Sequence, residues 1–249
     1  MGQRTALLAT LALTALSLTG YATYAAVTVN DTGDSRCIAS NGLPDHPTGT
    51  FPNRGNPHEI RAQNINVCIP SDPVKGDFAQ KVETIGIATN GVIIRPGTAD
   101  YYDASSPRGH SRDPSSGWNL EAIGAGNLGL DGQNAHVDHR GLYHYHGMPP
   151  ALDDVAVGTL SGWAADGFEI HYAGETARSS YALKAGTRPT APGGAYDGTY
   201  VEDWEYVEAL GNLDECNGAT VNGEYVYFAT DTFPFFPRCL WGTEIAQIR

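Results

Sequence analysis

The sequence predicts a mainly β protein: an antiparallel β-sandwich or barrel-like domain with long loops, few short helices and disulfide bonds. The 30 glycines and 15 prolines divide the 249-residue chain into short runs, and stretches with helical periodicity are scarce. Several of these runs alternate apolar and polar residues, as half-buried strands do. The four cysteines complete the pattern of a domain strengthened by covalent links.

Residues 1–25 have the features of a secretory signal peptide. The basic residue Arg4 precedes an apolar run from Ala6 to Leu18, and small residues follow near Ala25. This run is too short for a membrane span. A lipoprotein signal would need a cysteine where Tyr21 stands. We therefore expect an exported protein, periplasmic or extracellular, without a membrane span.

The four cysteines predict two disulfide bonds, because exported chains fold in an oxidising compartment. Sequence alone allows three connectivities. We favour Cys37 with Cys68 and Cys216 with Cys239, since each pair is local and flanks turn-rich sequence. None of the four has the surroundings of a catalytic or metal-binding thiolate.

The charge of the chain is strongly acidic. Its 15 Lys and Arg residues against 28 Asp and Glu residues give a formal net charge of −13. Such a surface repels nucleic acid and anionic lipid, and usually serves solubility. We expect no nucleic-acid partner.

Residues 26–59 are rich in proline and are interpreted as an irregular N-terminal extension, followed by one β-domain over residues 60–249. A single strand is expected before residue 75, near Asn64 to Ile69. Lys81 to Ile94 predicts a β-hairpin, because Asn90-Gly91 inside it is a strong two-residue turn signal.

Further along, the pattern indicates a short helical turn from Trp118 to Ile123 and three strand regions. Gly162 to Tyr172 is expected to form two strands joined by an Asp166-Gly167 turn. Tyr200 to Val207 is expected to be a strand with a packed aromatic face, which we favour over a carbohydrate-stacking platform. Glu224 to Thr230 is an aromatic-rich strand.

Half of the chain's eight histidines lie close together in the sequence, as His136, His139, His144 and His146. If residues 142–146 are extended, His144 and His146 share one face and Tyr143 and Tyr145 share the other. Two imidazoles then converge on one point, where they could bind a transition metal ion. Imidazole suits copper and zinc equally, so the cofactor is either ion.

A third imidazole would come from His136 or His139. Asp138 to Gly141 is interpreted as a turn that brings the preceding segment back beside the Tyr-His strand. The register of that pairing decides between the two histidines, because a slip of one residue moves His136 to the opposite face. Both stay open as ligands.

The predicted strand after Asp166-Gly167 carries two more polar candidates. Glu169 and His171 share a face, and would add a ligand or a general base if this strand lies beside the histidine stretch. Asp166 and Glu169 are therefore the candidate catalytic acid and base. Asp138 or Asp166 could also accept the second N–H of a ligating imidazole.

Several ordered blocks resemble the YHYH family of bacterial exported proteins, named for the Tyr-His-Tyr-His of residues 143–146. The blocks are Gly141 to Gly147, Gly162 to Ile170, Tyr196 to Val207, Leu213 to Gly218, and Pro237 to Cys239. The resemblance covers roughly residues 60–242, and implies a location and a domain type more than an activity. Such proteins usually have Asp-Gly-Phe-Pro-Ile-Tyr-Gly where this chain has Glu169 and His171.

Three functions follow from these patterns. The first is a secreted metal-binding protein, with His136, His139, His144, His146 and His171 as candidate ligands. The second is an extracellular hydrolase, either zinc-dependent or metal-free, although Gly-x-Ser-x-Gly and free-cysteine nucleophiles are missing. The third is a non-catalytic module that binds a glycan, another extracellular small molecule or a protein through Trp163 and Trp204.

Overall fold

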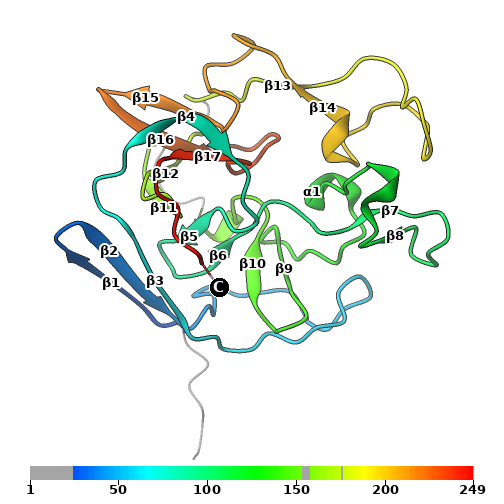
Figure 1. The fold of residues 1–249 in the computed structure, drawn as a ribbon. Helices are drawn as coiled ribbons and strands as arrows, with labels where there is room; N and C mark the ends of the chain where they lie inside the picture. Colours follow the sequence, from blue (N-terminus) through cyan, green and yellow to red (C-terminus); the bar gives the residue numbers. More distant parts are fainter. Residues whose placement is uncertain (1–24, 153–157, 175, 249) are drawn as a thin grey trace, which may run out of the picture.

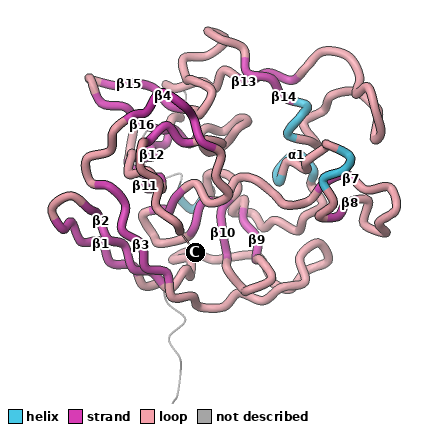
Figure 2. The backbone as a smooth tube through the Cα atoms, viewed as in Figure 1, coloured by secondary structure: helices cyan, strands magenta, loops and turns pink. Residues whose placement is uncertain are grey.

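The structure is a computed structural model that describes residues 25–152, 158–174 and 176–248 (Figure 1). Apart from Ala25, the predicted signal peptide lies outside the described residues. Strands and loops dominate the described chain, and its single α-helix is the four-residue α1 (Ala122–Ala125) (Figure 2). The predicted mainly β, disulfide-bonded class is confirmed.

An eight-stranded sheet forms the centre, in the order β15-β16-β12-β11-β5-β6-β10-β9. Its strands are β5 (Gly86–Ala88), β6 (Ile93–Ile94), β9 (Ala135–Val137), β10 (Tyr143–Tyr145), β11 (Leu160–Ala164), β12 (Glu169–Tyr172), β15 (Gly218–Val221) and β16 (Glu224–Ala229). Neighbours pair antiparallel, except that β10 runs parallel to β6 and β12 parallel to β16. The main hydrophobic core consists largely of residues of this sheet, together with apolar residues of neighbouring segments.

Both predicted Asx-Gly hairpins of this sheet are confirmed. Asn90-Gly91 joins the antiparallel pair β5 and β6, and Asp166-Gly167 joins β11 and β12. Gly167 has φ +94°, and a Cβ there would lie 2.3 Å from the carbonyl oxygen of Pro70. Only glycine fits this turn, because positive φ strains other residues and a neighbouring backbone occupies the space.

The expectation of irregular structure in the N-terminal extension is wrong for residues 27–40. A hairpin of β1 (Val27–Thr32) and β2 (Ser35–Ser40) pairs with β3 (Ile65–Pro70) in a three-stranded sheet. Gly33, with φ +66°, allows the tight turn between β1 and β2. The strand expected near Asn64 to Ile69 is confirmed as β3.

The remaining elements are short. Two-stranded sheets pair β4 (Lys75–Gln80) with β17 (Leu240–Gly242), β7 (Tyr101–Tyr102) with β8 (His110–Ser111), and β13 (Tyr181–Leu183) with β14 (Trp204–Tyr206). Three 3-10 turns are Pro114–Ser116, Pro150–Leu152 and Val201–Asp203.

Several predicted boundaries differ from the structure. The hairpin expected from Lys81 has its first strand only from Gly86. The helical turn expected from Trp118 to Ile123 is formed later, as α1, because Glu121 caps its N-terminus. The strand expected from Tyr200 to Val207 is reduced to β14. Its first part turns because the buried Asp203 carboxylate accepts hydrogen bonds from the backbone N–H of Gly198 and Tyr200.

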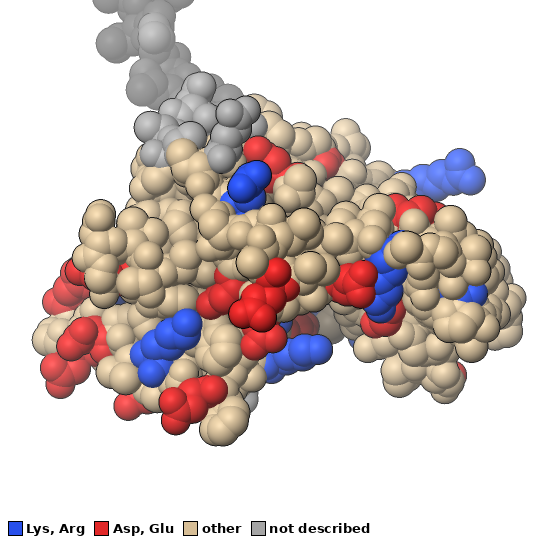
Figure 3. Space-filling model, turned by 90° about the horizontal axis from the view of Figure 1, so that it is seen from above, with Lys and Arg blue, Asp and Glu red and all other residues tan. Residues whose placement is uncertain are grey.

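Two disulfide bonds close local loops, as predicted. Cys37 is bonded to Cys68 across β2 and β3, and Cys216 to Cys239 near the C-terminus. Within the described chain, no helix is long and apolar enough to cross a membrane. Acidic and basic side chains are interspersed on the visible face in Figure 3.

Candidate metal centre

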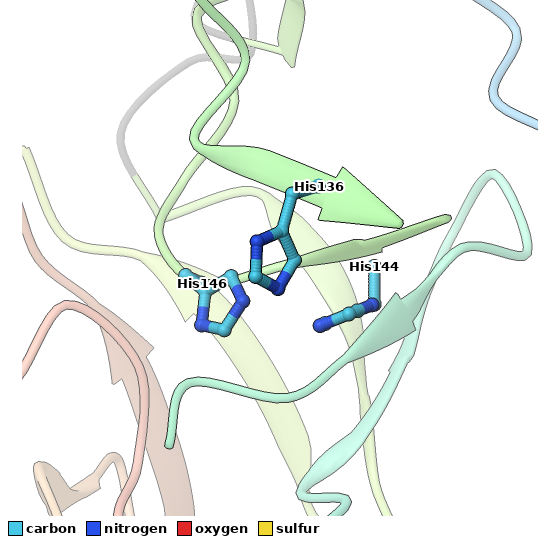
Figure 4. A group of neighbouring side chains, drawn as sticks. All are labelled: His136, His144 and His146. Atoms are coloured by element: carbon cyan, nitrogen blue, oxygen red, sulfur yellow. The ribbon is translucent and has the colours of Figure 1, made fainter. Parts of the chain in front are cut away.

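Three of the predicted ligands meet at the edge of the central sheet (Figure 4). His136 on β9 pairs directly with His144 on β10, and His146 follows two residues later on the same side. The ring centroids are 4.8 Å apart for His136 and His144, 4.6 Å for His136 and His146, and 4.8 Å for His144 and His146. One ligand atom from each ring lies within 4.8 Å of the others.

Backbone carbonyl groups fix the orientation of all three rings. The Nδ1 atoms of His136, His144 and His146 lie 2.9, 3.1 and 3.2 Å from the carbonyl oxygens of Leu128, Leu142 and Pro96, in that order. A carbonyl oxygen only accepts, so each Nδ1 carries the proton and donates it. Each Nε2 is then unprotonated, and its lone pair is available to bind a metal ion.

Burial keeps the triad neutral. His144 and His146 are 3% and 1% exposed, and His136 is half-buried. Desolvation lowers the pKa of His136 and holds the pKa of His144 and of His146 well below the ordinary value. At neutral pH the three rings are therefore uncharged, and protons do not compete with a metal ion for Nε2.

One of these nitrogen atoms has no hydrogen-bond partner in the described chain. His146 Nε2 is buried and unsatisfied, which is costly unless something else pairs with it. Nitrogen ligands 2.0–2.1 Å from one metal ion lie roughly 3.3–3.6 Å from each other. Ring movements of about 1 Å would bring the triad to that spacing, so the residues fit a transition metal ion.

Charged groups stand close to the triad but do not bond to its rings. Asp138 pairs with Arg95 at 3.4 Å and accepts backbone N–H groups from Arg140 and Leu142 in the turn between β9 and β10. Its expected role as acceptor for an imidazole N–H is taken by the backbone carbonyl groups. Sequence could not reveal these acceptors, because every residue has a carbonyl group.

Two predicted ligands lie away from the triad. His139 is exposed in the turn after β9, in a surface pocket shared with His58 and Glu59. His171 lies on β12, which three strands separate from β10. Its Nε2–H donates to Glu169 Oε2 at 2.6 Å. The β9–β10 register thus selects His136 rather than His139.

The candidate acid and base are also remote from the triad. Glu169 lies on β12 together with His171. A role at the triad required β12 to lie beside β10, and the two strands are not neighbours. Asp166 is fully buried in its turn, where Oδ2 accepts from the Tyr227 hydroxyl at 2.7 Å and from the Gly242 N–H at 2.9 Å. Burial raises the pKa of Asp166. These two contacts link the turn to β16 and β17.

Strand β10 alternates as expected, with its two tyrosines on the face opposite the triad. Tyr143 donates to Asp131 Oδ2 at 2.8 Å. The hydroxyl of Tyr145 lies 2.6 Å from His46 Nε2 and 2.9 Å from Asn90 Nδ2. The sequence did not predict the contact with His46, because no local sequence pattern links this residue to a tyrosine 99 positions later.

The sequence matches a known protein family. The sequence model of a family described as YHYH protein matches residues 66–242, which is most of the chain and includes the whole triad. No curated protein matches, and neither does any solved structure.

Proposed function

The chain belongs to the YHYH protein family, and from this premise we propose that it is an exported protein that binds one transition metal ion, copper or zinc. His136, His144 and His146 are its ligands, each through Nε2. Copper at this position would exchange single electrons, whereas zinc would act as a Lewis acid.

The unsatisfied Nε2 of His146 carries this proposal. A buried imidazole nitrogen without a partner is expensive in a protein that only needs a packed core. The other features of the triad agree with the proposal. The three neutral rings converge, and the Nδ1–H of each ring donates to a backbone carbonyl group. Ligating histidines usually have such a partner on the second nitrogen.

Export is supported by two features. Residues 1–25 have the pattern of a signal peptide, and both pairs of cysteines are joined as disulfides, which persist in oxidising compartments.

Metal analysis of the protein, purified without a histidine tag, tests the proposal. We expect close to one equivalent of copper or zinc after titration and desalting. His144→Gln and His146→Gln should each abolish retention. His171→Gln is the matched control, since it removes an imidazole from the same sheet outside the triad. Failure of the unmodified protein to take up any transition metal would refute the proposal.

A further inference from the structure

The face of β10 opposite the triad holds a tyrosine in an unusual setting. Tyr145 stands between the two ligands His144 and His146 in the sequence and is fully buried. Its ring is nearly parallel to that of His46, with centroids 5.9 Å apart and an interplanar angle of 24°. His46 is half-buried, and its neighbour Asp45 is exposed.

The direction of the hydrogen bond between these two rings is fixed by their other partners. His46 Nδ1 lies 3.0 Å from the carbonyl oxygen of Pro47, so it carries the proton and Nε2 is an acceptor. Asn90 Nδ2 can only donate, and it occupies one acceptor position on the phenol oxygen of Tyr145 at 2.9 Å. The phenol O–H therefore donates to His46 Nε2, at 2.6 Å.

An imidazole acceptor distinguishes Tyr145 from several other tyrosines of the described chain. The phenols of Tyr143, Tyr225 and Tyr227 donate to the carboxylates of Asp131, Asp214 and Asp166. Imidazole is the stronger base, because its conjugate acid has a pKa of about 6.5 and a carboxylic acid one of about 4. A phenol that loses an electron becomes very acidic, so a strong, prealigned base makes Tyr145 the easiest of these phenols to oxidise.

We propose that Tyr145 and His46 form a one-electron donor that draws oxidising equivalents away from the imidazoles of His144 and His146. Tyr145 gives one electron to a one-electron oxidant of the kind that a redox-active metal generates from hydrogen peroxide. Its O–H bond breaks and the proton forms an N–H bond at His46 Nε2. A neutral phenoxyl radical and an imidazolium remain, and a small reductant such as a thiol restores the phenol.

The donor itself needs no metal, whereas its protective role rests on the proposed metal site. His46 precedes the family match over residues 66–242, so the N-terminal segment of this chain supplies the proton acceptor. Near the surface, the imidazolium of His46 can release its proton to solvent.

Photochemical oxidation of the metal-free protein tests the donor. A ruthenium tris-bipyridine photo-oxidant with a sacrificial quencher removes one electron, and the phenoxyl radical is followed by absorbance and electron paramagnetic resonance. We expect a radical on Tyr145 that forms more slowly in D₂O. Tyr145→Phe should remove it, and His46→Gln should slow its formation roughly tenfold or more, because a positioned base is lost.

Tyr181→Phe is the matched control, because the phenol of Tyr181 donates to a backbone carbonyl oxygen rather than to a base. It should leave the rate and the isotope effect unchanged. Equal rates in His46→Gln and the unmodified protein would overturn the inference. So would the absence of an isotope effect in the unmodified protein, a measurement that does not depend on the folding of any variant.

Copper and hydrogen peroxide test the protective role, with mass spectrometry of oxidised histidine as the measurement. Tyr145→Phe should raise oxidation of His144 and His146 several-fold over the Tyr181→Phe control. Equal oxidation in both variants would overturn the protective role. If the unmodified protein binds zinc but not copper, the protective role fails alone; if it binds neither ion, the metal proposal fails as well. The photochemical result decides the donor in either case.

Discussion

Each imidazole of the triad is held by a main-chain carbonyl group rather than by a carboxylate. These carbonyl groups belong to Leu128, Leu142 and Pro96, in three different segments. The tautomer of each ring is therefore set by the path of the backbone, and no side-chain substitution removes the acceptor directly. The face shared by His144 and His146 could be predicted from strand alternation, but these acceptors could not.

The triad should make the metal-free protein sensitive to mild acid. Burial lowers the pKa of all three imidazoles in the folded state. Above about pH 6.5 the rings are neutral in both states and contribute no pH dependence. Below that value the three imidazoles bind protons in the unfolded chain but stay neutral in the folded chain, so the free energy of unfolding falls as pH falls.

The expected slope is up to about 1.4 kcal/mol per pH unit for each imidazole. Chemical denaturation at pH 7.5, 6.5, 5.5 and 5.0 measures it, and about two-thirds of the slope should remain in His144→Gln if the three rings contribute equally. Saturation with metal should shift the loss of stability to lower pH. Stability independent of pH in this range would contradict the buried neutral state.

At the scale of elements, the short helix α1 lies beside the residue that follows His146, because a Cβ on Gly147 would lie 2.7 Å from Cδ1 of Ile123. Glu121 caps the helix by accepting from the N–H of Ile123 at 2.8 Å and of Gly124 at 2.6 Å. The same carboxylate pairs with the largely buried Arg238 at 2.8 Å. Downstream of α1, the carbonyl group of Leu128 holds His136. The position of α1 thus affects one of the proposed ligands.

The ion pair of Glu121 and Arg238 should be important for stability. Both side chains are largely buried, and loss of one partner leaves an uncompensated buried charge. Glu121→Gln or Arg238→Met should each cost about 3–5 kcal/mol, and the double variant should cost less than the sum of the two. Asp31→Asn is the control, because it breaks the exposed pair with Arg36 and should cost about 1 kcal/mol or less. Denaturant titration measures all four variants.

Contact between α1 and the segment that follows β10 can be tested at Gly147. A Cβ at this residue would lie 2.7 Å from Cδ1 of Ile123. Gly147→Ala should therefore push α1 outward and cost about 1–3 kcal/mol. Ile123→Val removes that Cδ1 atom, so the double variant should recover much of the loss. Thermal unfolding and metal titration measure the cycle, and additive effects would show that the two residues are not in contact.

At the scale of the whole molecule, local signals predicted more than long-range ones. Alternation and Asx-Gly turns identified the hairpins at Asn90-Gly91 and Asp166-Gly167, and local spacing identified both disulfide pairs. The order of the central sheet could not be predicted, because its parallel pairs β10–β6 and β12–β16 join segments far apart in sequence. This order separates His171 from the triad, and alternation alone cannot determine it.

The two disulfides should contribute similarly to stability but differently to the proposed metal site. Cys37–Cys68 and Cys216–Cys239 span 31 and 23 residues, and loops of this size stabilise by about 3–4 kcal/mol in the chain-entropy model. Replacing either pair by serine should lower the free energy of unfolding by about that amount.

Only the second replacement should weaken metal binding, because Cys239 directly follows Arg238, whose ion pair with Glu121 holds the N-terminus of α1. The first disulfide lies in the separate three-stranded sheet. Denaturation measures the stability of the two double-serine variants, and isothermal titration with copper or zinc measures their affinity. Equal affinities would mean that the triad is positioned independently of the C-terminal segment, and that strands β9 and β10 alone determine its geometry.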